Sequence, residues 1–233
     1  MTPANAGKGG ASASAPPVPA RPSIPELLVD VGSLSSWIAD ENDGDPAGAH
    51  LHVTGCVESE VDFALIELAE SRVEGCACSS CDFSRGTFAD VAFSNCDFSN
   101  CDFSEASFTR CTFASCKLTG ANFTEAVLRI VDVRDSSCAY AWFTKARLDA
   151  VAVRTTDFSH ADLSEARLRR VAFDDARFAA TSFFRTSLAG VDLSTCQLSD
   201  IVLSDTMGEL RGCSMDLFQA AGIARRLGVV IKE

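Results

Sequence analysis

Large apolar residues recur at every fifth position of this chain from Phe63 to Leu203, without a single change of phase. The 29 positions of this series hold 14 Phe, 10 Leu, 3 Val and 2 Cys, and none holds a charged residue. A strand repeats every two residues and a helix every 3.6, so a period of five belongs to neither. Fixed spacing over such a length is the signature of a repeat protein.

A second inward series lies two residues before each of these centres. It contains only small or β-branched residues, such as Cys76, Cys96, Ala121 and Val131. Each unit of five therefore has one large inward residue, one small inward residue and three outward residues. Because one unit cannot bury a Phe alone, successive coils must stack on one another.

The outward charges indicate twenty residues per turn. Glu125, Lys145, Glu165 and Arg185 alternate in sign at a spacing of twenty, and neighbouring strands favour opposite charges. Four sides of five residues divide the 29 units into about seven coils. At the usual distance between strands, the predicted rod is about 35 Å long.

The repeat carries a recognisable motif, as in Ala121-Asn122-Phe123 and Ala161-Asp162-Leu163. In these units a small residue precedes Asp or Asn, which precedes the central Phe or Leu. The chain thereby resembles the pentapeptide repeat family over about 150 continuous residues. The resemblance implies an all-β fold, a right-handed quadrilateral parallel β-helix, which we expect over residues 51–206.

The N-terminal region lacks the repeat. Residues 1–22 are rich in Ala, Gly, Ser and Pro, which predicts a disordered leader. Residues 23–50 are expected to form a helix and linker, with Ser23 as a possible N-cap and an acidic, turn-rich link at 40–46. Glu58 interrupts the series of centres, so the first coil is expected near residue 50.

The C-terminal residues 207–233 predict a capping module. Gly208 takes a centre position, so the solenoid should end there, and a helix is expected over 214–228, capped by Asp216 or Ser214. A short strand is expected at 229–231. In Leu210-Arg211-Gly212, Gln219-Ala220 and Leu227-Gly228-Val229-Val230 this tail resembles the C-terminal module of quinolone-resistance (Qnr-type and MfpA-type) pentapeptide repeat proteins, which mediates a tail-to-tail homodimer. The expected capping and dimerisation residues are Leu217, Phe218, Ala221, Ala224 and Leu227.

The eleven cysteines all fall in inward phases, which predicts buried thiols rather than a metal centre. The chain has three His and no P-loop, dinucleotide glycine pattern or catalytic triad order. We therefore expect no enzyme activity, no cofactor and no metal. Without an export signal or a membrane-length apolar run, the expected location is cytoplasmic.

The net charge of −12 lies entirely before residue 126, which argues against direct nucleic-acid binding. Asp62, Asp82 and Asp102 should stack in one column, and stacked like charges are destabilising. The expected acidic face comprises Asp62, Asp82, Asp97, Asp102, Glu105 and Glu125.

Two interpretations of this face remain open. One is DNA mimicry, in which the rod binds DNA gyrase or topoisomerase IV and modulates quinolone sensitivity; the resemblance to Qnr-type and MfpA-type proteins favours it. The other is a scaffold or interaction module with an unrelated partner, the Asp serving turn chemistry and solubility. Two features oppose DNA mimicry. The unbroken register leaves no projecting loop of the kind that Qnr-type proteins have, and Arg134 over Arg154 and Arg147 over Arg167 interrupt any phosphate-like track.

Overall fold

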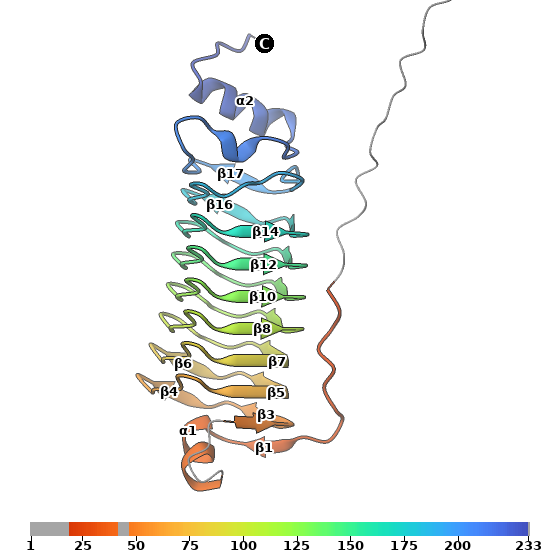
Figure 1. Ribbon diagram of the computed structural model, residues 1–233, viewed down its shortest axis with the longest axis vertical. Helices are drawn as coiled ribbons and strands as arrows, with labels where there is room; N and C mark the ends of the chain where they lie inside the picture. The colour runs from red at the N-terminus through yellow and green to blue at the C-terminus, as the bar shows by residue number, and fades with distance from the viewer. Residues whose placement is uncertain (1–18, 42–46, 233) are drawn as a thin grey trace, which may run out of the picture.

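The computed structural model describes residues 19–41 and 47–232, and it shows a straight parallel β-solenoid with a C-terminal helix (Figure 1). Most of the predicted leader and of the predicted acidic link lies outside the described residues. The elements are β1 Val29–Val31, α1 Leu34–Ser36, the π-helical turn η1 Trp37–Glu41, β2 Ala47–Ala49, β3 Leu51–Thr54, β4 Val57–Ser59, β5 Glu67–Glu74, β6 Ala77–Ser79, β7 Thr87–Ser94, β8 Ser107–Thr109, β9 Thr112–Ala114, β10 Val127–Arg129, β11 Asp132–Arg134, β12 Arg147–Asp149, β13 Ala152–Arg154, β14 Arg167–Arg169, β15 Ala172–Asp174, β16 Arg177–Ala179, β17 Gln197–Ser199, the 3₁₀ turn η2 Gly208–Leu210 and α2 Leu217–Arg226.

From β2 onward, parallel strands pair at a register of twenty residues, as predicted. Leu128 of β10 lies opposite Phe108 of β8 and Leu148 of β12. The solenoid has about eight turns rather than seven, because it extends further at both ends. At the start, Ala47 of β2 already pairs with Glu67 of β5.

The four sides differ in how continuous their strands are. We number them by their centres: side 1 runs from Phe63 to Leu203, side 2 from Leu68 to Leu188, side 3 from Val73 to Leu193 and side 4 from Cys78 to Leu198. β5 and β7 pass around the corner between sides 2 and 3, which joins these sides in one 13-stranded sheet. Sides 1 and 4 are held largely by isolated parallel bridges.

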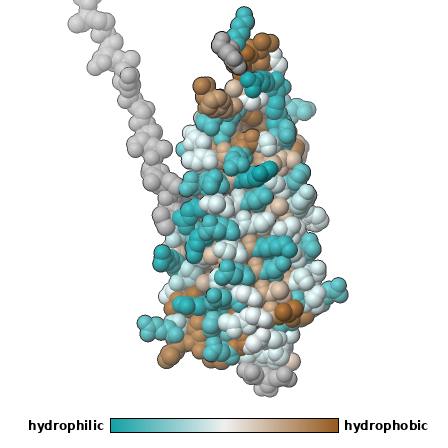
Figure 2. All heavy atoms as spheres, turned by 180° about the vertical axis from the view of Figure 1, so that it is seen from behind, coloured by the Kyte–Doolittle hydropathy of each residue, from teal (hydrophilic) through white to brown (hydrophobic). Residues whose placement is uncertain are grey.

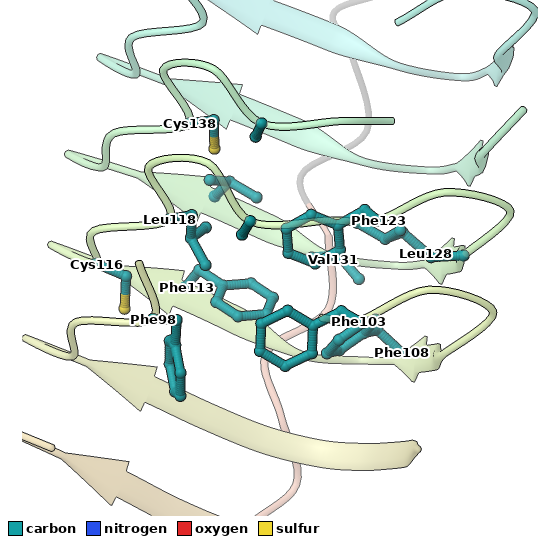
Figure 3. Close-up of a cluster of buried hydrophobic side chains, with 14 of the residues drawn as sticks. Phe98, Phe103, Phe108, Phe113, Cys116, Leu118, Phe123, Leu128, Val131 and Cys138 are labelled. Atoms are coloured by element: carbon teal, nitrogen blue, oxygen red, sulfur yellow. The ribbon is translucent and has the colours of Figure 1, made fainter. Parts of the chain in front are cut away.

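The centres form ladders of stacked side chains inside the rod (Figure 3). On side 1, the rings of Phe83 and Phe103 stack at 5.0 Å, and those of Phe103 and Phe123 at 5.1 Å. Rings from neighbouring sides meet edge to face, as in Phe93 and Phe98 at 5.5 Å. Both arrangements are favourable for aromatic pairs. An interior pocket lined by Phe113 and Leu118, among others, has a volume of only about 20 Å³, so the rod is filled.

The corners of the solenoid place a residue at positive φ at every fifth position from His50 to Gly190. Non-glycine residues such as Glu105 (φ 58°) and Arg110 (φ 52°) adopt the left-handed region at steps of five along the chain. Each such residue costs roughly 1–2 kcal/mol. Hydrogen bonds between coils offset this cost, as in Glu105 N–H donating to the Thr124 carbonyl at 2.9 Å. Local preference alone would not produce these corners, so stacking of coils imposes them.

The Asp or Asn before a centre stabilises the turn that follows it. The Asp82 carboxylate accepts a hydrogen bond from the Ser84 backbone N–H at 2.8 Å, and Asn122 accepts one from Thr124 at 3.0 Å. These are Asx turns, in which a short polar side chain satisfies the backbone two residues later. The motif of the repeat therefore has a structural cause on the outside of the rod.

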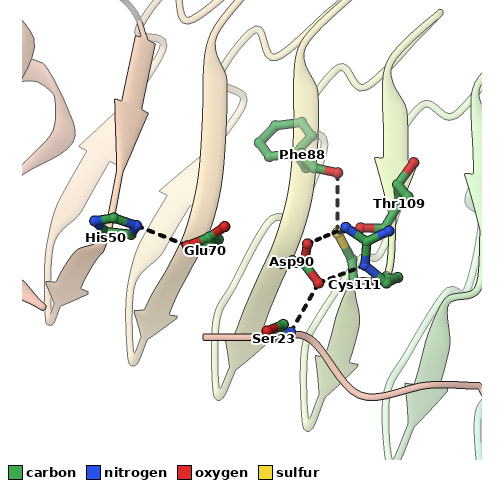
Figure 4. A network of polar contacts seen from close by, with 8 residues as sticks. Ser23, His50, Glu70, Phe88, Asp90, Thr109 and Cys111 are labelled. Atoms are coloured by element: carbon green, nitrogen blue, oxygen red, sulfur yellow. Dashed lines mark hydrogen bonds and ion pairs between the residues drawn. The ribbon is translucent and has the colours of Figure 1, made fainter. Parts of the chain in front are cut away.

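The expected helix at Ser23 is wrong. Residues 19–28, which we call the N-terminal strap, run without regular structure along the outside of the rod (Figure 1). The Ser23 N–H donates to Asp90 at 2.9 Å, and the Asp90 carboxylate also binds the Arg110 guanidinium (Figure 4). Ser23 lies 67 residues from Asp90 in sequence. A tertiary contact of its backbone N–H therefore fixes Ser23 in place of the expected helix cap.

The first coil is closed by β1 and the short helical segment after it. β1 pairs with β3, with Val29 opposite Leu51. Ser33 caps α1, and Trp37 is buried against Gly48, where a Cβ atom would come within 2.7 Å of the indole ring. A side chain at position 48 would therefore displace the ring.

Glu58, the charged residue in a centre position, is buried at 6% exposure. Its carboxylate accepts hydrogen bonds from the Ser33 hydroxyl at 2.8 Å and the Ser35 hydroxyl at 2.9 Å. The residue that interrupted the sequence pattern therefore joins the first coil to α1. A buried carboxylate is tolerated when its oxygens are hydrogen-bonded.

The solenoid does not end at residue 206 as predicted. Leu193 N–H donates to the Ser214 carbonyl at 2.9 Å, and Asp192 bridges Ser214, a spacing of 22 that accommodates η2. α2 then begins at Asp216, whose side chain forms a capping box with Gln219, as expected for an N-cap. The predicted strand at 229–231 is wrong, because these residues form no strand.

Candidate acidic face

Three of the predicted acidic residues form one ladder on side 1. Asp62 bridges Asp82, and Asp82 bridges Asp102, in parallel register. All three side chains point outward, and neighbouring rungs are about 4.8 Å apart. The expected column of carboxylates is therefore present, and it is followed on the same side by Asn122 and Trp142.

Each of these carboxylates uses one oxygen in an Asx turn. Asp62 accepts from the Ala64 N–H at 2.9 Å, and Asp102 accepts from the Ser104 N–H at 2.8 Å through Oδ1. Oδ1 of Asp102 also accepts from the Asn122 amide at 3.0 Å. Among the described residues, the Oδ2 atoms of the ladder have no hydrogen-bond partner. The ladder thus serves the turn and still presents negative charge to solvent.

Asp97 lies around the corner, on side 4, and its charge is compensated. It pairs with Lys117 of the next coil at 3.1 Å and accepts from the Ser99 backbone N–H at 2.9 Å. Burial opposes ionisation, but these hydrogen bonds and the Lys117 charge outweigh it and hold the pKa of Asp97 below its ordinary value. Asp97 therefore does not extend the ladder.

Glu105 and Glu125 lie on the corner between sides 1 and 2, one coil apart. Both are exposed and adopt positive φ. Lys145 lies 4.0 Å from Glu125, so the sign of the column reverses at the next coil. Of the six predicted acidic residues, only the three of the ladder and Glu105 therefore have no cation within ion-pair distance among the described residues.

The cysteines form part of the core. Ten of the eleven are buried and Cys213 is half-buried, and all are free thiols. Burial raises the pKa of Cys101 and of Cys111 to about 12, which keeps both protonated at neutral pH. Within residues 19–41 and 47–232, no three His, Cys, Asp or Glu side chains are close enough together to hold a metal ion.

The histidines take part in surface contacts. His50 pairs with Glu70 at 2.8 Å and His52 with Asp30 at 2.8 Å. The imidazole of His160 stacks on the Tyr140 ring at 4.7 Å. No helix in the described part of the chain is both long and apolar enough to cross a membrane.

Trp142 and Tyr140 form an exposed aromatic pair on side 1 that was not predicted from the sequence. Trp142 occupies the outward position that holds Asp in the ladder, and Tyr140 lies two residues before it on the corner; both are 56% exposed. The signal was available, because Trp replaces the Asp or Asn of the motif at this rung. Trp142 therefore interrupts the outward column of side 1, which continues with Asp162 and Ser182.

The expected dimerisation residues lie on α2 and at its C-cap, Leu227, and they differ in exposure. Leu217, Phe218 and Leu227 are exposed, at 80%, 84% and 63%. Ala221 and Ala224 are only partly exposed. Figure 2 shows apolar side chains gathered at both ends of the rod and a mainly polar surface between them.

The sequence of this chain matches two models of known protein families. The pentapeptide repeat region model matches residues 86–162 and 106–183, and the pentapeptide repeats (8 copies) model matches residues 62–104. Together the matches span more than half of the chain, so this chain belongs to the pentapeptide repeat family. Among curated proteins, no relative matches it significantly.

Solved structures of the same fold include two trypsin-treated variants of QnrB1, a plasmid-mediated fluoroquinolone resistance protein. One variant has a TM-score of 0.57 and 20% identity, covering 80% of this chain and 99% of the QnrB1 chain. The other has a TM-score of 0.60 and 20% identity, covering 88% and 98%. At this identity the similarity establishes the fold. HetL from the cyanobacterium Nostoc also matches, with 16% identity and a TM-score of 0.30 over 79% of this chain and 98% of HetL.

Proposed function

We propose that this chain is a non-enzymatic binding rod whose acidic ladder docks on the basic DNA-binding surface of a type II topoisomerase. The observation that carries the proposal is the in-register stack of Asp62, Asp82 and Asp102. Such a stack is unfavourable for the isolated protein, and a basic partner would neutralise it. The fold shared with QnrB1, a fluoroquinolone resistance protein, supports DNA gyrase or topoisomerase IV as the partner and quinolone sensitivity as the outcome.

Electrostatics favours this partner over free nucleic acid. The chain has a net charge of −12, so phosphates are repelled, whereas a Lys- and Arg-rich saddle is attracted. The free Oδ2 atoms of the ladder supply acceptors for guanidinium groups, which bind carboxylates through paired hydrogen bonds.

The test uses the double variant Asp82→Asn/Asp102→Asn in assays of gyrase supercoiling and of quinolone-induced DNA cleavage. Asn preserves the Asx turn, as Asn122 does in this same ladder, and removes only the charge. We expect wild-type protein to alter both reactions at micromolar concentration and the double variant to lose the effect.

A matched control is Asp157→Asn/Asp192→Asn, in which both residues make the same turn on sides 4 and 3. This control should retain wild-type activity. The proposal is wrong if wild-type protein changes neither gyrase nor topoisomerase IV. If both double variants are equally inactive, net charge rather than the ladder is responsible.

A second candidate function is a scaffold for an unrelated protein. The exposed Trp142 and Tyr140 favour it, because Trp and Tyr dominate the energetics of protein interfaces. A partner whose binding is lost in Trp142→Ala and unaffected by Asp82→Asn/Asp102→Asn would establish this function instead.

We also propose that two copies associate through α2. Leu217, Phe218 and Leu227 expose apolar side chains to solvent, and burial of such surface drives association. The helix lies at the C-terminal end of the rod (Figure 1), so a tail-to-tail dimer leaves the four sides free for partners.

A further inference from the structure

Side 2 carries a cluster of arginines in the second half of the rod, which we call the arginine face: Arg129, Arg147, Arg167 and Arg169. Arg147 of β12 lies directly opposite Arg167 of β14 in the parallel register. Both side chains are exposed. Neither forms a hydrogen bond or an ion pair with any residue that the structure describes.

The neighbouring side shows how this fold neutralises the same arrangement. Arg134 lies opposite Arg154 on side 3, but both bind Asp132, at 2.7 and 2.6 Å. Asp132 is mostly buried, at 11% side-chain exposure. The stacked arginine pair on side 3 is thus neutralised by a carboxylate of the protein itself, whereas the pair on side 2 is not.

The remaining charges near the arginine face do not remove its excess. Arg169 and Arg170 share Asp149, at 3.9 and 2.8 Å. A surface depression of about 360 Å³ is lined by Glu125, Lys145, Arg147, Glu165 and Arg167. Its two glutamates face other cations at the limit of ion-pair distance, Lys145 and Arg185, each at 4.0 Å.

We propose that the arginine face docks an acidic segment of a protein partner, with one carboxylate bridging Arg147 and Arg167. Guanidinium groups match carboxylates through paired hydrogen bonds, and the bridging carboxylate takes the part that Asp132 plays on side 3. This surface is distinct from the acidic ladder in charge and in side, so it does not rest on the topoisomerase proposal.

The dimensions favour an acidic peptide over a nucleic acid. From β10 to β14 the face spans two strand spacings, about 10 Å, which equals about three residues of extended chain. A phosphate track would have to continue into the first half of the rod, where all the excess negative charge lies. A long polyanion is repelled there, whereas a short acidic segment is not.

The experiment measures binding of a fluorescein-labelled hexaglutamate peptide by fluorescence anisotropy at low salt. Wild-type protein should bind it, and Arg147→Gln/Arg167→Gln should weaken the binding about tenfold or more. The matched control, Arg72→Gln/Arg85→Gln, removes two arginines from the acidic half of the rod, and it should bind as wild type does. Because the double variant also relieves a like-charge stack, its Tm should rise by about 1–3 °C.

Four outcomes would overturn the proposal. One is the absence of peptide binding by wild-type protein. Another is equal weakening in both double variants, since net charge would then explain the result. A third is tighter binding of a twelve-nucleotide oligothymidine than of the peptide, which would assign the face to nucleic acid. The fourth is a higher Tm of Arg147→Gln/Arg167→Gln without loss of peptide binding, which would show that the stack is only a structural defect.

Discussion

The N-terminal end of the rod is closed by buried residues, whereas the C-terminal end is closed by a helix in which no residue is buried. At the N-terminal end, Leu34 and Trp37 are 2% and 8% exposed and belong to the core. At the C-terminal end, the side chains of Gln219 and Arg226 hold α2 by hydrogen bonds to backbone carbonyls of the last coil. The N-terminal end is thus sealed by buried apolar side chains, and the C-terminal end by these polar contacts together with partly buried residues such as Ile223.

This difference explains why apolar residues of α2 remain available. Gln219 donates to the carbonyls of Leu193 and Cys196 at 2.8 and 2.7 Å, and Arg226 donates to that of Ile201 at 2.7 Å. Acceptors left open at the end of the solenoid are thereby satisfied, while Leu217 and Phe218 are exposed to solvent. An end whose apolar residues are buried contributes stability, and an end held largely by hydrogen bonds can offer its exposed apolar side chains to a second molecule.

The largest effect is expected at the N-terminal end. Trp37→Ala removes a buried aromatic side chain and should lower the free energy of unfolding by about 3–5 kcal/mol. Denaturant titration followed by circular dichroism measures the loss. Phe218→Ala at the other end, studied at a protein concentration that keeps the chain monomeric, should change it by less than about 0.5 kcal/mol. Similar losses at both ends would contradict the contrast.

A smaller effect is expected where the strap meets the rod. Asp90→Asn should cost about 1–2 kcal/mol, because it weakens the hydrogen bonds from Ser23 and from the partly exposed Arg110. Hydrogen exchange at the Ser23 amide should accelerate, and amides of α2 should not change. Unchanged exchange at Ser23 would show that the strap is held by other contacts.

The same contact predicts a dependence on pH. The Arg110 guanidinium, aided by the Ser23 N–H and opposed by burial, holds the pKa of Asp90 below its ordinary value. The stabilisation is therefore complete above the unfolded-state pKa of about 3.9 and is lost as the pH falls through the lower folded-state value. The difference between wild type and Asp90→Asn should be constant near neutral pH and should shrink below about pH 4.

The smallest effect on stability, with the clearest effect on assembly, is expected on α2. Phe218→Glu places a charge on a residue that is 84% exposed, so the monomer should lose less than about 0.5 kcal/mol. Light scattering should show the variant as a monomer and the wild type as a dimer. Gln197→Glu, an exposed change on β17, is the matched control and should remain dimeric.

Much of the fold could be predicted from the period of five alone. The repeat continues without a shift from Phe63, so it identifies each buried centre and each small residue before it. Counting in steps of twenty also placed Asp62, Asp82 and Asp102 in one ladder. Asp216 was recognisable because a helix cap depends on residues within one turn.

The ends could be predicted less well, because distant contacts decide them. Ser23 has the local features of a helix cap, yet it binds Asp90 on another coil. Glu58 interrupts the series of apolar centres, and no residue near it in sequence predicts its hydrogen bonds with the hydroxyl groups of Ser33 and Ser35. The unpaired state of Arg147 likewise depends on which side chains lie beside it in space.

The unbroken count of five has a geometric consequence for how the sides are related. An insertion of twenty residues in phase would lengthen the rod by one strand spacing, about 4.8 Å, and leave every surface facing the same way. An insertion of five would instead turn everything beyond it by a quarter revolution. The acidic ladder and the arginine face keep their relative orientation only because no such unit has been gained or lost between Asp102 and Arg147. The number of five-residue units between two surfaces thus determines the angle between them around the rod axis as well as their separation along it.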